Sequence, residues 1–182
     1  MQNTMRYRRA IIPGGTFFFT VVTEQRRPLL QQPAALGCLR GAFRAVMKQR
    51  PFRIDAVAIL PDHLHCIWTM PQDDSDYATR WLLVKTWCTK HWPDPVPDAP
   101  DPARAARGEH ALWQRRYWEH AIRDDLDFAR HFDDVHDNPV KHGYVSRPAD
   151  WPYSSFRRAV EMGVYAEDWT CAPEELDGVG HE

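Results

Sequence analysis

Two histidines separated by one residue, His63 and His65, are the pair in this chain whose type and spacing most directly suggest chemistry. They lie in the segment HLHCIWT, which is predicted to be a strand. Because side chains alternate along a strand, both imidazoles face one side while Leu64, Cys66 and Trp68 face the core. Two imidazoles on one face can share a divalent cation, and phosphate oxygens can complete its coordination. A His-x-His pair also arises by chance among nine histidines, and the strongly apolar opposite face is what favours a metal site.

A second group of polar residues lies in the segment 131–145, HFDDVHDNPVKHGYV. Asp134 and Asn138 are four residues apart on a predicted helix and therefore share a face, as do His131 and Asp134 at a spacing of three. The alternative interpretation is an ordinary solvated helix face that ends at a proline turn.

Arginine is interleaved with aromatic rings in the segment 113–120, WQRRYWEH. This combination is typical of phosphate contacts and base stacking. An ordinary sheet strand with outward polar residues explains the segment equally well.

These residues must be positioned by a small α+β domain. Strands are predicted at 16–23, 52–60, 63–69 and 113–122, and helices at 33–50, from residue 77 after an Asp76 cap, and from residue 124 or 125 to the Asn138-Pro139 pair. A loop or insert is predicted at 92–108, an aromatic turn at 149–156 and an acidic tail at 159–182. The order β-α-β-β-α-β-α predicts a ferredoxin-like antiparallel sheet of about four to five strands covered by helices.

Length and composition exclude several classes of protein. The chain has 182 residues, is 43% hydrophobic and 26% charged, and has no apolar run of the ~18–20 residues that a membrane helix needs. The four cysteines form no CxxC pair, which is typical of reduced thiols in a cytosolic protein. A membrane protein, a disordered chain and a secreted mini-protein are therefore excluded.

The net charge of −2 hides a strong asymmetry along the chain. Residues 1–60 hold ten Lys or Arg against two Asp or Glu, whereas residues 159–182 hold no Lys or Arg and seven acidic residues. Such asymmetry favours a polyanionic partner. Of the cations, 19 are Arg and 4 are Lys; this composition suits phosphate binding, although the Arg preference of a GC-rich genome accounts for it equally well.

Taken together, five segments in this order resemble the REP-associated tyrosine transposases, which belong to the single-tyrosine HUH (histidine–hydrophobic–histidine) superfamily. The segments are RYRR with GGT and the following Phe strand, LPDHLHCIW at 60–68, WQRRYWEH at 113–120, NPVKHG at 138–143 and DWPYS at 150–154. The resemblance covers about residues 5–158. It implies an HUH domain over 1–158, with the Pro-rich loop 92–108 inserted and the acidic tail 159–182 following.

The resemblance implies a bacterial enzyme that cuts and rejoins single-stranded DNA near REP hairpins. The metal ligands would be His63, His65 and Asn138, and the ion Mg²⁺ or Mn²⁺. The family's nucleophilic tyrosine maps to Asp134, and a second family aromatic maps to Asp137. A carboxylate that attacked phosphorus would form a hydrolysable acyl phosphate. Tyr117 is the nearest substitute by sequence context, but a rescued nucleophile is not expected, so the chain is expected to have lost most or all covalent cleavage.

The expected partners are single-stranded, REP-like DNA hairpins, bound by a monomer in the cytoplasm, associated with the nucleoid, with no membrane involved. The residues predicted to contact DNA are Arg6, Arg8, Arg9, Arg40, Arg44, Arg115 and Arg116. One alternative is a catalytically inactive, domesticated DNA-binding protein. Another is a metal-dependent nuclease in which His63, His65 and Asp134 hold an ion that activates water. The sequence contains no G-x-S-x-G, P-loop or Rossmann glycine pattern, which argues against an unrelated hydrolase.

Overall fold

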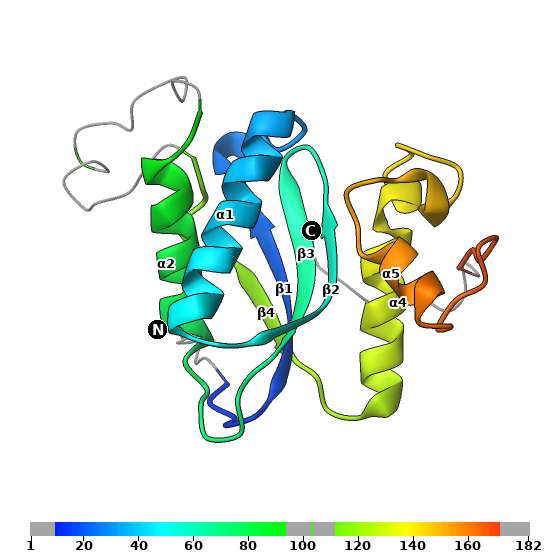
Figure 1. Cartoon of the computed structure of the whole chain (residues 1–182), viewed down its shortest axis with the longest axis horizontal. Coiled ribbons are helices and arrows are strands. Elements are labelled where there is room, and N and C mark those ends of the chain that lie inside the picture. Colours follow the sequence, from blue (N-terminus) through cyan, green and yellow to red (C-terminus); the bar gives the residue numbers. More distant parts are fainter. Residues whose placement is uncertain (1–9, 94–102, 104–111, 172–182) are drawn as a thin grey trace, which may run out of the picture.

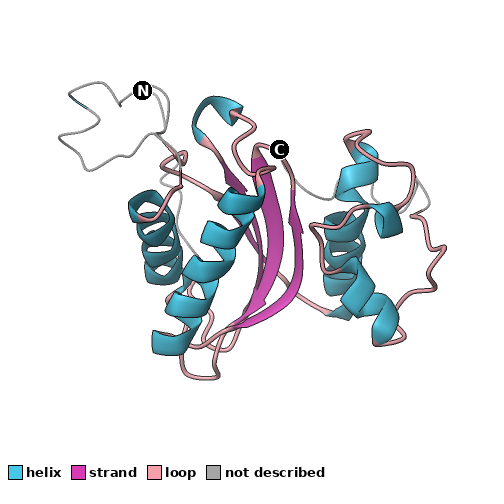
Figure 2. Cartoon of the chain, turned by 45° about the horizontal axis from the view of Figure 1, so that its top comes forward, coloured by secondary structure: helices cyan, strands magenta, loops and turns pink. Residues whose placement is uncertain are grey.

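The computed structural model describes residues 10–93, 103 and 112–171. Figure 1 shows a single sheet with helices α1 and α2 on one face and helices α4 and α5 on the other, and Figure 2 shows the sheet lying between these two helical layers. This sheet and its two helical layers confirm the predicted α+β class. No helix within the described ranges is long and apolar enough to cross a membrane.

The sheet is antiparallel throughout and has the strand order β2-β3-β1-β4. The strands are β1 (Thr16–Val22), β2 (Arg53–Ile59), β3 (His63–Thr69) and β4 (Trp118–Ala121). The hairpin predicted from the short Pro61-Asp62 breaker joins β2 to β3. Strand β1 lies between β3 and β4, and its Thr20 is directly opposite His65.

The larger core lies between the sheet and helices α1 (Pro33–Gln49) and α2 (Tyr77–Lys90). Phe17 and Phe19 of β1 point to this face, together with Leu64 and Trp68 of β3, and all four side chains are fully buried. Trp68 stacks on Trp81 of α2 at a ring-centroid distance of 4.2 Å. Because β3 alternates, this packing turns its histidines to the opposite face.

The opposite face is covered by α4 (Asp125–Lys141), the short helix η2 (Pro148–Asp150) and α5 (Phe156–Glu161). Its apolar part is smaller, and it packs Phe18 and Ile67 of the sheet against Val135 of α4. The described part of the acidic segment also packs here, because Tyr165 stacks between Phe156 and Trp169. The acidic segment from residue 172 onward lies outside the described residues.

The outer edge of the sheet is partly closed by the segment that precedes α5. Ser155 donates its backbone N–H to Val57 O at 2.8 Å, and Ile59 donates its own to Tyr153 O at 2.8 Å. The indole of Trp151 donates to Ile59 O at 3.0 Å. These bonds anchor residues 151–155 along β2, where an unpaired edge would otherwise remain.

Three predicted elements differ from the structure. The strand predicted at 113–122 is limited to Trp118–Ala121 because only these four residues pair with β1, while Trp113 makes an isolated bridge to Thr23. The third helix continues past Pro139 to Lys141, because a proline in the last turn removes one N–H donor while His142 N–H still bonds Asn138 O at 3.0 Å. The predicted turn at 149–156 contains the end of η2 and the first residue of α5.

Candidate metal and nucleic-acid site

The two histidines of β3 face α4, as the alternation predicts, and both are completely buried. Their ring centroids are 4.9 Å apart, and the ring planes are nearly perpendicular at 84°. The pair therefore forms a compact group of nitrogen donors near the start of β3, at the end of the sheet where α4 terminates.

Each histidine is oriented by a hydrogen bond through its Nδ1 atom. His63 Nδ1 donates to the Asp62 carboxylate at 2.6 Å, and His65 Nδ1 is hydrogen-bonded to the hydroxyl of Thr20 at 2.9 Å. The Nε2 atoms of both rings are buried and have no hydrogen-bond partner within the described residues. A histidine whose Nδ1 is held by a carboxylate or hydroxyl presents Nε2 as a ligand atom, which is the usual arrangement at metal sites.

Burial favours the neutral form of both imidazoles, which is the form that binds metals. Burial lowers the pKa of His63, although the neighbouring Asp62 carboxylate opposes this shift. Burial lowers the pKa of His65 further, well below its usual range, and the positive charges of nearby groups add to the effect.

The end of α4 forms the wall opposite the histidines. Asn138 is buried, and its Oδ1 atom has no hydrogen-bond partner within the described residues. The ring of His142, just beyond the helix, lies 5.0 Å from that of His63. Asp134 is 1% exposed and accepts a hydrogen bond from the ammonium group of Lys141. The carboxylate at the position expected for the nucleophile is thus buried and paired with a partly exposed ammonium group.

Three residues at this site were not predicted. His142 belongs to the NPVKHG segment, but it follows the proline at which the helix was expected to end. Lys141 neutralises Asp134, and Arg26 reaches Asp62 with an Nη1–Oδ2 distance of 3.2 Å. The spacing of seven between Asp134 and Lys141 places both on one helix face, which was the signal that could have identified the pair.

A second group of histidines lies on the same sheet face, nearer the start of α4. Ligand-type atoms of His120, Asp127 and His131 are all within 4.8 Å of one another. His120 Nε2 donates to Asp127 Oδ2 at 2.8 Å, Arg123 Nε donates to the same oxygen at 3.1 Å, and His131 Nδ1 donates to the backbone oxygen of Asp127 at 2.8 Å. The two imidazoles are stacked at 12° with centroids 4.5 Å apart. In this arrangement the group is a hydrogen-bonded network that ties β4 to α4.

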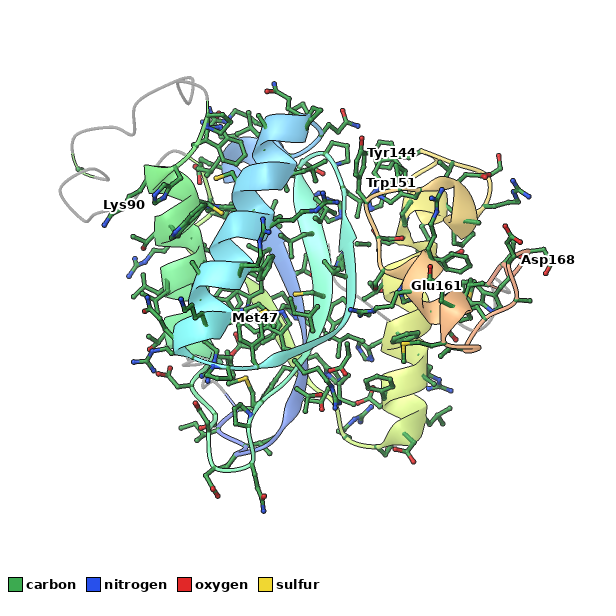
Figure 3. The ribbon with its side chains drawn as sticks, in the orientation of Figure 1. Met47, Lys90, Tyr144, Trp151, Glu161 and Asp168 are labelled. Atoms are coloured by element: carbon green, nitrogen blue, oxygen red, sulfur yellow. The ribbon has the colours of Figure 1, made fainter. Side chains whose placement is uncertain are left out.

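Tyr117 is on the wrong face of the sheet to act near the histidine pair. Its ring packs 5.9 Å from both Phe19 and Trp81, in the core beneath α2, and Lys85 lies over it at 5.1 Å. Tyr144 lies beside the site, since its ring stacks 5.9 Å from that of His142. Figure 3 shows Tyr144 next to Trp151 where the β2–β3 hairpin approaches the end of α4.

The residues predicted to contact DNA fall into three groups. Arg40 and Arg44 lie one turn apart on α1 and are exposed, and Arg115 and Arg116 are exposed just before β4. The cluster at positions 6, 8 and 9 (Arg6, Arg8 and Arg9) lies outside the described residues.

The fold and the site define a class: an antiparallel α+β protein in which a His-x-His strand is closed by a polar helix. Comparison with known proteins specifies the family. The chain is 43% identical over 163 residues to the REP-associated tyrosine transposase of Escherichia coli (strain K12), a match that covers 90% of this chain and 89% of the relative. It is 41% identical to a putative REP-associated tyrosine transposase of Haemophilus influenzae, over 92% of this chain and 94% of the relative.

A solved structure of the REP-associated tyrosine transposase bound to a REP hairpin has a TM-score of 0.77 to this chain at 40% identity, and the match covers 93% of each chain. No protein-family model matches the sequence. The chain belongs to the REP-associated tyrosine transposases.

Proposed function

We propose that this chain binds single-stranded hairpin DNA of the REP type and holds a divalent cation at His63 and His65, but does not cleave DNA through a covalent intermediate. The observation that supports the metal site most directly is the pair of buried Nε2 atoms. Each of these two rings is oriented by a hydrogen bond at its Nδ1 atom, to Asp62 for His63 and to Thr20 for His65. A relative at 40% identity and with the same fold was solved with a REP hairpin bound, which supports this class of DNA as the partner.

The residues at the site fit a divalent cation. The Nε2 atoms of His63 and His65 and the amide oxygen Oδ1 of Asn138 are buried polar atoms with no hydrogen-bond partner within the described residues, and leaving such groups unsatisfied is costly. We assign these three residues as its ligands. Mg²⁺ and Mn²⁺ suit a site that leaves positions for phosphate oxygens. A bound ion would neutralise the charge of a phosphate placed against it.

The loss of covalent cleavage is argued from Asp134 and Asp137. A tyrosine at position 134 would attack the phosphate, whereas the carboxylate of Asp134 is paired with the ammonium group of Lys141. A carboxylate that did attack would give an acyl phosphate, which water hydrolyses before the DNA end can be transferred. Asp137 is buried, and burial raises the pKa of its carboxyl group.

The test uses the full chain, a single-stranded REP hairpin that extends beyond its stem, and Mn²⁺, analysed on a denaturing gel. The wild-type chain should give neither a covalent protein–DNA adduct nor cut DNA. The double variant Asp134→Tyr with Asp137→Tyr should give an adduct. The matched control, Asp134→Phe with Asp137→Tyr, restores the aromatic rings without the nucleophilic hydroxyl and should give none.

Two results would overturn this assignment of activity. An adduct with the wild-type chain would show that a nucleophile survives. Cut DNA without an adduct would indicate a metal-dependent nuclease that uses activated water. If the double variant folds and binds the hairpin but forms no adduct, the loss is not confined to these two positions.

DNA contacts are proposed for Arg40 and Arg44 of α1 and for Arg115 and Arg116, all of which are exposed, together with the N-terminal cluster. The chain is proposed to act on DNA as a monomer, associated with the nucleoid. A sedimentation measurement with and without the hairpin tests the monomer, and a stable dimer would contradict it.

A further inference from the structure

We propose that His120, Asp127 and His131 form a second metal site, which takes Zn²⁺ or a transition-metal ion of the same kind and joins β4 to the start of α4. This site is separate from the histidine pair of β3, and it does not depend on the proposed DNA binding. The proposal is carried by the types of the three donors, the distances between their ligand atoms and their burial.

The three side chains come from two elements that follow one another in the chain. His120 lies on β4, whereas Asp127 and His131 lie near the start of α4, four residues apart and therefore on one face of the helix. Figure 1 shows the chain passing from β4 directly into α4. Two imidazoles and one carboxylate are a donor set that Zn²⁺ takes in proteins, whereas Mg²⁺ prefers oxygen ligands alone.

The distances between the ligand atoms suit a tetrahedral ion. His120 Nε2 is 2.8 Å from Asp127 Oδ2, and His131 Nδ1 is 3.2 Å from Asp127 Oδ1. One ligand atom from each of the three residues lies within 4.8 Å of the other two. A tetrahedral Zn²⁺ with bonds of about 2.0–2.1 Å holds its ligand atoms about 3.4 Å apart. This separation lies between the observed distances, so small side-chain rotations bring the three donors to one ion, which replaces the protons on the two imidazole nitrogens.

Burial and supporting hydrogen bonds are also those of a metal site. Asp127 is 6% exposed and His131 is 5% exposed. Asp127 Oδ2 accepts hydrogen bonds from the backbone N–H and the Nε of Arg123 at 3.0 and 3.1 Å, and such bonds hold a ligating carboxylate in place. The side chain of His120 is 25% exposed, so water can reach the fourth position of the ion.

The two groups of histidines share no residue. The ring of Phe18 contacts both of them, with its centroid 5.4 Å from that of His65 and 5.0 Å from that of His131. Phe18 is fully buried and has no atom that binds a metal. A substitution in one group therefore removes no ligand from the other, and the two sites can be tested separately.

The experiment is equilibrium dialysis of the full chain against Zn²⁺, followed by analysis of the metal bound per chain. His120→Gln should bind one Zn²⁺ fewer than the wild type, and so should Asp127→Asn, which keeps the shape of the side chain and an oxygen for Arg123. His91→Gln, which replaces an exposed histidine at the end of α2, is the matched control and should bind the same number as the wild type. Any Zn²⁺ bound by the pair on β3 is the same in all four proteins, so the difference reports on this site alone.

A second measurement tests the link between β4 and α4. An ion that binds only the folded chain stabilises it by mass action. At a free Zn²⁺ concentration about 100 times the Kd of this site, Zn²⁺ should raise the Tm of the wild type by about 5–10 °C more than that of His120→Gln. The His91→Gln variant should show the same increase as the wild type.

The two measurements can each refute the site. A wild type that binds no Zn²⁺ would overturn the proposal, and so would equal binding by the wild type, His120→Gln and Asp127→Asn. In either case the three residues form a hydrogen-bonded network only. Loss of one Zn²⁺ in His91→Gln as well would show that the ion was held by exposed histidines. Equal increases in Tm for the wild type and His120→Gln would refute the stabilising link.

Discussion

Replacing Thr20 by valine should weaken the binding of Mn²⁺ without changing a single proposed ligand. Thr20 is 2% exposed, and its hydroxyl is 2.9 Å from Nδ1 of His65. Valine has nearly the same shape, but it cannot hydrogen-bond the ring. Loss of a bond that orients a metal-binding histidine typically lowers affinity by 10–100-fold. Because the remaining ligands are untouched, we expect the lower end, about tenfold or about 1.4 kcal/mol.

The same substitution should also cost stability, because the ring nitrogen of His65 is left buried without its partner. The expected cost is about 1–3 kcal/mol in the free energy of unfolding, measured by urea denaturation without metal. Affinity is measured by isothermal titration calorimetry of the folded protein with Mn²⁺. The buffer contains no urea, and the temperature is well below the midpoint of thermal unfolding.

The matched control for Thr20→Val is Thr16→Val. Thr16 lies on the same strand and the same sheet face, and its hydroxyl is 2.9 Å from that of Thr69. It should lose a comparable hydrogen bond and keep the Mn²⁺ affinity. Equal Mn²⁺ affinity of Thr20→Val and wild type would refute the orienting role of Thr20. Failure of the wild type to bind Mn²⁺ would refute the metal site itself.

Three further predictions concern charge. Affinity for the REP hairpin should fall steeply with salt, by about 0.9 in log–log slope for each phosphate contact made with duplex DNA, and a flat response in a binding titration would contradict the phosphate contacts. Asp137→Asn should raise the urea midpoint at pH 7 and have little effect near pH 3. Burial raises the pKa of Asp137, so folding is not penalised by this carboxyl group at low pH, where it is protonated, and the penalty from its buried charge develops as pH rises through that pKa. Asp127→Ala should cost about 2 kcal/mol at pH 7, because His120 and Arg123 lose a shared acceptor. Burial alone would raise the pKa of Asp127, but these two donors hold it well below its usual range. The stabilisation that Asp127 provides is therefore present above about pH 4 and is lost as pH falls. The difference in stability between Asp127→Ala and the wild type should shrink in acid.

Much of the site could be predicted from local spacing. The alternation of β3 separates His63 and His65 from the core, and the helical spacing of Asp134 and Asn138 places them together on α4. Both patterns depend only on the geometry of one element. For the same reason the antiparallel sheet and its covering helices were predictable from the order of the elements.

The remaining features depend on how separate elements pair. Thr20 supports His65 because of the register of β1 with β3, which no local pattern specifies. Tyr117 faces the α2 side because it precedes Trp118, whose ring meets Phe18 on the opposite face, and the pairing of β4 with β1 sets which face each side chain takes. His142 was missed because Pro139 was expected to end the helix, whereas the last turn tolerates the loss of one N–H donor.

The order in which the chain is synthesised has a consequence for this site. Strands β1, β2 and β3 are complete by residue 69, so the histidine pair and its supports can assemble early during translation. The helix that buries the pair is made more than 50 residues later. At the ~5–20 residues per second of protein synthesis, a few seconds separate the completion of β3 from the synthesis of α4, the helix that covers the two imidazoles proposed as metal ligands. The order of synthesis thus leaves both rings without their covering helix until α4 is made, whereas both are buried in the folded protein.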